Sequence, residues 1–304
     1  MVKPGLQNHA FTSPLRYPGG KGALAKFMRV VVTENNLLDG HYVEVFAGGA
    51  GIAWSMLFGE YVRHVHINDL DRSIYSFWLS VMDYTDDLCR LIQDTRVSMT
   101  QWRKQKAIQD NADEYSALER GFSTFFLNRT NRSGIIAGGV IGGKNQTGPW
   151  KLDARFNKRD LVKRIQRIAR YRNHISVYGL DGKDFITQVL PMLPIQALVY
   201  LDPPYYAKGN GLYQNHFTPR DHEGIAKIIQ KRIRQPWIVS YDAVPEIASL
   251  YKGKREFHYH LSYSAQARYS GEEIMFFSDG IVIPDTSHPV IPKRNRRIPP
   301  AAPL

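Results

Sequence analysis

The chain has 304 residues, of which 43% are hydrophobic and 22% are charged, and these values are typical of a globular protein. No apolar run approaches the ~20 residues needed to cross a bilayer, which excludes a membrane-spanning enzyme. Forty Lys and Arg against 28 Asp and Glu give a net charge of +12, so a polyanion such as nucleic acid is favoured as a partner.

The start of the chain and its cysteine content bear on where the protein works. The first residues contain no apolar segment typical of a secretory signal. Cys89 is the single cysteine, so neither an intramolecular disulfide nor a cysteine metal cluster can form. We therefore expect a protein of the reducing cytoplasm that makes no membrane contact.

A glycine turn between two predicted strands marks the first part of the chain. The pattern predicts a buried strand at 42–46, a turn at 48–51, a helix at 52–57 and a second strand at 62–67. This order predicts a parallel sheet with a ligand crevice at the carboxyl ends of its strands. Asp69 follows the second strand, where a carboxylate accepts from a ribose hydroxyl in nucleotide-binding units. Because no Lys follows the glycines, adenosine without phosphates is favoured over a nucleotide, although close helix packing would also explain the glycines.

The stretch from about 81 to 175 differs from the α/β pattern on either side. Its polar segments of helical length contain few apolar anchors, so we expect an inserted helical region. Within it, residues 134–148 contain six glycines and are predicted to form a loop. From Arg159 to Asn173, apolar residues recur at helical spacing among basic ones, which predicts an amphipathic helix. Its basic face would contact phosphates or simply face solvent.

The α/β pattern returns after this region. The predicted strands cover residues 197–201, 237–241, 257–264 and 273–278. The last two are expected to pair antiparallel at the sheet edge. Thr218 and Pro219 indicate a helix start, and His222 is expected to be a helix-boundary or surface histidine rather than a metal ligand, because no third ligand keeps a suitable spacing. Residues 285–304 are basic and Pro-rich, which is typical of a mobile tail.

The strongest chemical signal is Asp202-Pro203-Pro204-Tyr205, which directly follows a predicted buried strand. Two consecutive prolines fix the chain, remove two N–H donors and leave the preceding carbonyls as rigid acceptors. This set suits a planar amine, because Asp202 and a carbonyl would accept its two hydrogens while Tyr205 stacks on the ring. A plain strand-ending turn is the alternative interpretation.

Several segments occur in an order that resembles a known family. They are Pro14-Leu15-Arg16-Tyr17-Pro18-Gly19-Gly20-Lys21, Glu44-Val45-Phe46-Ala47-Gly48-Gly49-Ala50-Gly51, Asn68-Asp69, Asp202-Pro203-Pro204-Tyr205 and Trp237-Ile238-Val239-Ser240-Tyr241-Asp242. With these segments in this order along the chain, the sequence resembles the Dam-like class of DNA adenine-N6 methyltransferases over most of residues 13–280. The resemblance implies an α/β fold with a Rossmann-like methyltransferase sheet, mostly parallel with a late antiparallel strand, plus an inserted helical target-recognition region. It also implies S-adenosylmethionine as the cofactor.

The resemblance assigns the zones of the chain and their site residues. Residues 1–80 and 176–284 would form the two halves of the catalytic domain, 81–175 the target-recognition insertion and 285–304 the tail. Cofactor contacts are implied for Tyr17, Lys21, Phe46, Gly48, Asp69, Asp184, Phe185 and Asp202. Catalysis is implied at Asp202, Pro203, Pro204 and Tyr205. No metal is expected in the chemistry, and the setting would be a bacterial or phage-infected cell.

Two segments depart from the family pattern. Ala50 stands where many relatives carry the second glycine of a Phe-x-Gly-x-Gly turn. The commoner Asn-Gly-Leu segment reads here as Asn131-Arg132-Ser133-Gly134-Ile135. We expect Arg129, Asn131 and Arg132 to contact nucleic acid, with a solvated polar loop as the alternative.

The expected reaction is methyl transfer from S-adenosylmethionine to the N6 amine of an adenine flipped out of double-stranded DNA. A methyltransferase acting on cytosine N4 or on protein glutamine is one alternative, and a DNA-binding module without catalysis is another. Asp202 and the segment 14–21 favour adenine, because glutamine enzymes carry Asn at the first motif position. The intact Asp202 and Tyr205 argue against an inactive module.

Overall fold

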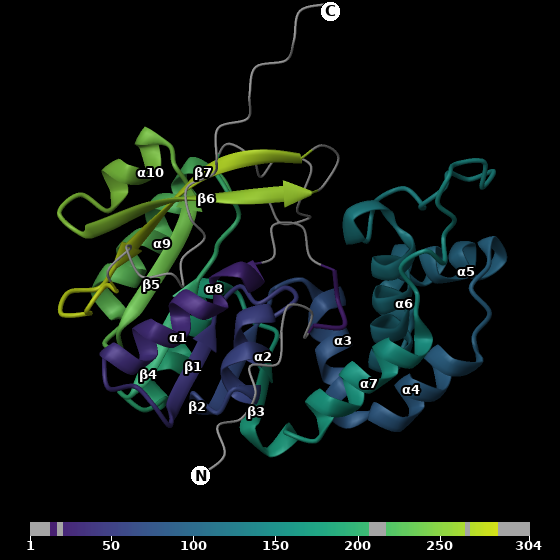
Figure 1. Ribbon diagram of the computed structural model, residues 1–304, viewed down its shortest axis with the longest axis horizontal. Coiled ribbons are helices and arrows are strands. Elements are labelled where there is room, and N and C mark those ends of the chain that lie inside the picture. Colours follow the sequence, from purple (N-terminus) through teal and green to yellow (C-terminus); the bar gives the residue numbers. More distant parts are fainter. Residues whose placement is uncertain (1–12, 17–20, 207–216, 265–267, 285–304) are drawn as a thin grey trace, which may run out of the picture.

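The computed structural model describes residues 13–16, 21–206, 217–264 and 268–284. Figure 1 shows a body built around a sheet on one side and a group of helices, α3 to α7, on the other. The strands of the sheet are β1 Gly40–Glu44, β2 Val62–Asn68, β3 Ile175–Tyr178, β4 Ala197–Leu201, β5 Trp237–Asp242, β6 Arg255–Ser264 and β7 Arg268–Phe277. The helices are α1 Ala25–Glu34, α2 Gly51–Phe58, α3 Arg72–Asp83, α4 Thr85–Asp94, α5 Met99–Asp110, α6 Ala117–Thr130, α7 Lys158–Ala169, α8 Gly182–Asp184, α9 Pro219–Arg232 and α10 Pro245–Leu250.

Within the described residues, the strands form one sheet in the order β3-β2-β1-β4-β5-β7-β6. Strands β1 to β5 pair in parallel, whereas β7 runs antiparallel to both β5 and β6. The mostly parallel Rossmann-like methyltransferase sheet with a late antiparallel strand is therefore confirmed. Its parallel strands end along one edge, which brings Asp69 after β2 and Asp202 after β4 to the same side of the molecule.

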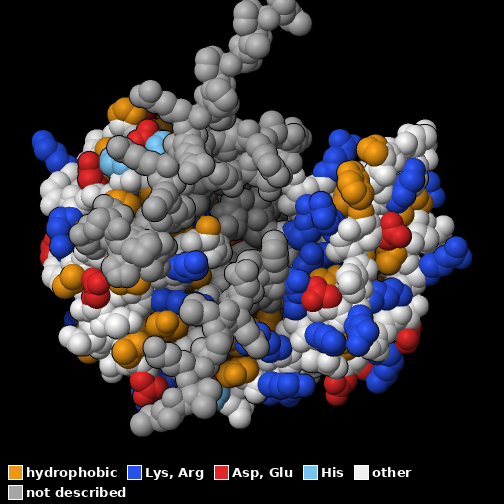
Figure 2. Space-filling view, in the orientation of Figure 1, with side chains coloured by type: hydrophobic (Ala, Val, Ile, Leu, Met, Phe, Trp, Pro, Cys, Tyr) orange, Lys and Arg blue, Asp and Glu red, His pale blue; other side chains and the backbone are white. Residues whose placement is uncertain are grey.

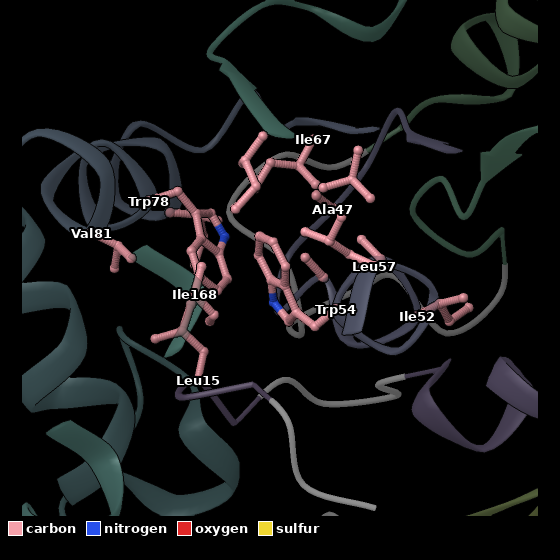
Figure 3. Packing of buried hydrophobic residues seen from close by; sticks show 14 of the residues in the cluster. Leu15, Ala47, Ile52, Trp54, Leu57, Ile67, Trp78, Val81 and Ile168 are labelled. Atoms are coloured by element: carbon pink, nitrogen blue, oxygen red, sulfur yellow. The ribbon is translucent and has the colours of Figure 1, made fainter. Parts of the chain in front are cut away.

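Both faces of the sheet are covered, because neighbouring strand residues point to opposite sides. Tyr42 of β1 belongs to an apolar cluster with residues of α1 to α4, and Val43 belongs to a second cluster with residues of α9 and α10. Figure 3 shows the first cluster, in which Trp54 of α2 and Trp78 of α3 lie side by side with ring centroids 4.9 Å apart. These two rings join the helical region to the sheet.

Several predicted elements are confirmed with small shifts. The first strand occupies Gly40–Glu44 rather than 42–46, and the basic helix ends at Ala169 rather than at Asn173. Thr218 caps α9, since its hydroxyl accepts from Asp221 N at 3.3 Å and the Asp221 carboxylate accepts from Thr218 N at 3.0 Å. This reciprocal capping box is the reason the helix starts where the sequence predicts.

Other expectations on the chain need correction. The pattern did not predict β3, because its four residues Ile-Ser-Val-Tyr are too few to show a period. The expected boundary near residue 81 falls inside α3. His222 is not at the surface: it is 1% exposed, and its ring packs against those of Tyr206, Phe217 and Tyr241. The expected tail lies outside the described residues. In the part of the chain described here, no helix is both long and apolar enough to cross a membrane.

Candidate active site

The glycine turn after β1 is shaped by contacts from three directions. Gly48 has φ 48°, a conformation that favours glycine, and its N–H donates to Asp69 Oδ2 at 2.8 Å. The indole N–H groups of Trp78 and Trp54 donate to the carbonyls of Gly48 and Gly49 at 2.9 and 3.2 Å. Ala50 takes φ 50° directly before α2, so alanine itself adopts the left-handed conformation in this turn. The core therefore fixes this turn.

The carboxyl ends of β1 and β2 are tied together by Asn68. Its side-chain amide donates to the carbonyls of Val45 and Leu180, both at 3.0 Å, and its amide oxygen accepts from Leu180 N at 2.9 Å. The loop that follows β3 is held against the glycine turn in this way. Every hydrogen-bonding atom of the amide is used, which explains why a buried polar residue is placed here.

Asp69 lies at the same edge with its carboxylate partly exposed. Its Oδ1 accepts from Asp71 N at 2.9 Å, in addition to the bond from Gly48. Burial and the neighbouring Asp71 charge raise the pKa of Asp69 to about 7, against the lowering effect of these two N–H donors. A carboxylate held by two backbone groups is fixed in position and still has oxygen lone pairs for a ligand hydroxyl.

An aromatic wall stands beside Asp69. The Phe46 ring lies on Gly182, where an added Cβ would come within 2.7 Å of the ring, so a larger residue would have to displace the ring. Phe217 meets Phe46 edge to face with centroids 6.1 Å apart. Asp184 is exposed at the end of α8, whereas the Phe185 side chain is fully buried in the core. The backbone N–H of Phe185 donates to Asp181 O and its carbonyl accepts from Leu190 N, so neither the side chain nor the backbone of Phe185 is exposed to a ligand.

The carboxylate of Asp202 follows β4 and is 20% exposed. Ser240 Oγ of β5 donates to its Oδ1 at 2.8 Å, and Lys21 Nζ lies 3.4 Å from the same oxygen. Pro203 is buried and Pro204 half-buried. Burial and the nearby Glu273 charge raise the pKa of Asp202 to about 6, while Lys21 and the Ser240 hydroxyl act to lower it.

Lys21 and Tyr205 meet a buried carboxylate that the sequence analysis did not single out. Glu273 of β7 accepts from Lys21 Nζ at 2.6 Å, from the Tyr205 hydroxyl at 2.5 Å and from the Tyr259 hydroxyl at 2.6 Å. Lys21 also contacts the Tyr205 hydroxyl directly. The signal in the sequence is an acidic residue directly before the apolar run Ile274–Phe277, because a charge in a buried strand needs a partner.

A second buried carboxyl group lies behind the glycine turn. Glu44 ends β1 and accepts from Ala53 N of α2 at 2.9 Å. Burial, with a smaller contribution from Asp202, raises the pKa of Glu44 to about 8. Three carboxyl groups with raised pKa values, Glu44, Asp69 and Asp202, therefore lie at the carboxyl ends of neighbouring strands, which is typical of a functional site.

The site predicted from the sequence is only partly assembled by the described residues. Lys21, Asp202 and Tyr205 come together around Glu273, and Gly48 contacts Asp69. Tyr17 lies outside the described residues, so its cofactor role stays a prediction.

The three residues expected to contact nucleic acid are not equivalent. Arg129 is 8% exposed and donates to the carbonyl of Pro14, and Asn131 is fully buried and donates to the carbonyls of Ile135 and Ile136. Their burial corrects the expectation of direct contact, because neither offers the surface that a phosphate or base needs. Arg132 is exposed beside Gly139. Figure 2 shows many other Lys and Arg side chains over the helical region.

The family model for D12 class N6 adenine-specific DNA methyltransferases matches residues 17–266. The chain belongs to this family. It is therefore an enzyme that methylates the N6 amine of adenine in DNA, and the alternatives of cytosine N4, protein glutamine and an inactive DNA-binding module are set aside. The matched range ends before Glu273, so the buried carboxylate beside Lys21 and Tyr205 is seen only in the structure.

Solved structures similar to the chain include the rRNA methyltransferase aviRa from Streptomyces viridochromogenes, with 10% identity, a TM-score of 0.39, and coverage of 91% of this chain and 94% of that one. Another is precorrin-6y C5,15-methyltransferase from Geobacter metallireducens, with 9% identity, a TM-score of 0.35, and coverage of 82% and 84%. A comparison with curated proteins gives no match.

Proposed function

We propose that the adenine-N6 methyltransferase takes its methyl group from S-adenosylmethionine and acts on an adenine flipped out of duplex DNA. When bound, this cofactor supplies an electrophilic methyl group on a sulfonium. The fixed Asp69 carboxylate would accept from its ribose hydroxyls, and the wall of Phe46 and Phe217 over Gly182 would contact its adenine. The exposed Asp184 carboxylate would accept from the adenine amine. Lys21, Gly48, Asp202 and, outside the described residues, Tyr17 are also proposed to contact the cofactor.

Asp202 carries the proposal for the target base. The N6 lone pair of adenine is delocalised into the ring, so the amine is a poor nucleophile until it becomes pyramidal. Asp202 and a main-chain carbonyl beside Pro203 and Pro204 would accept the two N6 hydrogens and localise the lone pair on nitrogen. The bound cofactor would supply the methyl group to this lone pair, and Asp202 would then take up the N6 proton. Acceptors fixed in advance stabilise the positive charge that develops on nitrogen.

A duplex hides the N6 amine, which is why base flipping belongs to the proposal. Extrusion of the adenine costs a few kcal/mol of stacking and pairing. Tyr205 is 7% exposed and its hydroxyl is anchored on Glu273, so its ring is held in one position, and we propose that the flipped base stacks against the edge of the site that this ring forms. The net charge of +12 supports duplex DNA as the partner, because phosphate contacts supply most of the affinity.

The test is single-turnover transfer of labelled methyl from S-adenosylmethionine to an adenine-containing duplex, with the products digested to nucleosides. Asp202→Ala is expected to fold normally and to lose the transfer rate by at least ~100-fold, the scale for removing one stabilising group. Asp153→Ala makes the same change at an exposed aspartate and should keep the wild-type rate. A near-normal rate for Asp202→Ala would refute the proposed role.

A further inference from the structure

The buried carboxylate of Glu273 has a place in the reaction that the family match does not assign. It is 0% exposed and lies on β7, yet it accepts hydrogen bonds from three donors that come from distant parts of the chain. Lys21 precedes α1, Tyr205 follows β4, and Tyr259 lies on β6. Bonds to an ionised carboxylate are about twice as strong as neutral ones, so Glu273 fixes these donors relative to one another.

Stability alone is a weak reason for this arrangement. Removing two charges from water costs several kcal/mol per ion, and apolar residues of the same volume often stabilise a protein as well or better. Glu273 lies on β7, which is paired with β5 on one side and β6 on the other, and a hydrophobic side chain would be buried there without that cost. Its position beside Asp202 and Tyr205 offers a chemical reason instead.

The ammonium of Lys21 lies between two carboxylates at unequal distances. It is 2.6 Å from Glu273 Oε2 and 3.4 Å from Asp202 Oδ1, so the closer partner is Glu273. Ser240 donates to that same Oδ1. Within the described part of the chain, the donors to Asp202 all approach Oδ1, and Oδ2 receives none of them. One carboxylate oxygen is thus left for a hydrogen of the target amine.

We propose that Glu273 is a positioning residue for methyl transfer, which draws the Lys21 ammonium away from Asp202 and anchors the Tyr205 hydroxyl so that Asp202 keeps one oxygen for the target amine. The inference rests on the proposed role of Asp202. Without the Glu273 charge, the ammonium would pair directly with Asp202 and compete with the substrate for its oxygens. The Tyr205 ring would lose its strongest anchor at the same time.

The charges around Asp202 give the proposal a signature in the pH profile. The charged and titratable groups that interact with Asp202 come from all the elements around it: Lys21, Tyr42 and Glu44 of β1, Tyr200 of β4, Tyr205, Tyr241 of β5, Tyr259 of β6 and Glu273 of β7. Glu273 acts to raise the pKa of Asp202 and Lys21 acts to lower it. Neutralising Glu273 should therefore lower the pKa of Asp202. The acid limb of the pH profile, where the transfer rate falls as Asp202 becomes protonated, should then move to lower pH.

The experiment measures single-turnover methyl transfer against pH for the full chain, with S-adenosylhomocysteine affinity determined separately by calorimetry. Glu273→Gln keeps the volume and removes the charge. At the optimum pH its rate is expected to fall between ~10- and ~100-fold, because displacing a reacting group by about 1 Å can cost 10²-fold. The acid limb is expected to shift to lower pH. Glu272→Gln, on the exposed side of the same strand, should change neither.

A second variant separates the charge from the shape. Glu273→Asp keeps the charge on a shorter side chain, so the rate should fall while the acid limb stays where it is in the wild type. If Glu273→Gln does not fold, this variant decides the proposal, since a wild-type rate for Glu273→Asp would overturn it. The proposal would also be overturned if a folded Glu273→Gln lost its transfer rate in acid at the same pH as the wild type. If Asp202→Ala remains active, the proposed function itself fails, whichever result Glu273 gives.

Discussion

The side-chain amide of Asn128, on α6, forms hydrogen bonds with both the N–H and the C=O of Arg16. Its Oδ1 accepts from Arg16 N at 2.7 Å, and its Nδ2 donates to Arg16 O at 2.6 Å and to Gly134 O at 2.8 Å. Arg129 Nε donates to Pro14 O at 2.7 Å, and Arg164 Nη1 donates to Ser13 O at 3.1 Å. The helical region thus fixes the segment 13–16, which leads along the chain to Lys21.

This relationship predicts the effect of Asn128→Ala. The change leaves the N–H and C=O of Arg16 without their partner, and each unsatisfied buried group costs about 1–3 kcal/mol. We expect the free energy of unfolding, measured by urea denaturation, to fall by about 2 kcal/mol or more. The transfer rate should fall as well, because Lys21 is no longer held from its N-terminal side. Asn111→Ala, at an exposed position, should stay within about 0.5 kcal/mol of the wild type. Equal stability of the two variants would refute a stabilising role for the Asn128–Arg16 pairing.

The residues that the sequence predicts on DNA, Arg129, Asn131 and Arg132, lead to a second prediction. Arg132→Ala removes an exposed charge. It should reduce the slope of log duplex affinity against log salt concentration by about one, without loss of stability. Fluorescence anisotropy between ~50 and ~200 mM salt measures the slope.

Arg129→Ala should destabilise the fold, because it leaves the buried Pro14 carbonyl without its hydrogen-bond donor. Burial and the charges of Arg164 and Arg16 lower the pKa of Arg129 to about 9, as expected for a guanidinium enclosed among like charges.

The sequence predicted the parts of the site that local chemistry determines. Asp202 and Asp69 follow buried strands, and in a parallel sheet the ends of such strands must share an edge. Glu273 escaped prediction because its meaning depends on Lys21, more than two hundred residues away, and pairing between β6 and β7 carries no local signal of that contact. The burial of Arg129 was not predicted, because the exposure of a helical residue depends on what packs against the helix. No motif reveals that the segment 13–16 covers it.

The histidine cluster on β1 and β2 predicts a loss of stability in acid. A ring nitrogen of His41 lies 3.0 Å from a ring nitrogen of His66, and the His64 ring is stacked on His41 and tilted against His66. Burial and the neighbouring histidines lower the pKa of His66 to about 3 and that of His64 to about 4. Each folded pKa is below the unfolded value of about 6.5, so the unfolded chain binds more protons in this window. Stability is then intact above pH 6.5 and is lost as pH falls toward 4.

His66→Gln tests this dependence, because glutamine does not titrate. At pH 5 the imidazole of His66 should cost about 2 kcal/mol relative to pH 7.5, so the variant should lose less stability between these pH values than the wild type does. The comparison cancels the carboxyl groups with raised pKa values, which act in the opposite direction. His260→Gln, at an exposed position, should follow the wild type. Parallel pH curves for His66→Gln and the wild type would rule out the cluster as the cause.

Asp69 predicts a pH dependence of cofactor binding. Its folded pKa of about 7 exceeds the ordinary carboxyl value, so its ionisation opposes folding as pH rises through 7. Ribose hydroxyls that donate to the carboxylate favour the ionised form, and they therefore lower this pKa on binding. Binding near pH 6.5 should release a proton, and affinity should rise between pH 6 and 8. Calorimetry with 5′-methylthioadenosine, which has the ribose but no titrating amino acid, in buffers of different ionisation enthalpy measures that proton directly.

The variant Asp69→Asn should bind this ligand more weakly and release no proton. Because it leaves no charge to bury, it should also gain stability above pH 7 in the ligand-free state. A wild-type proton release in Asp69→Asn would show that another group, such as Glu44, titrates with the ligand.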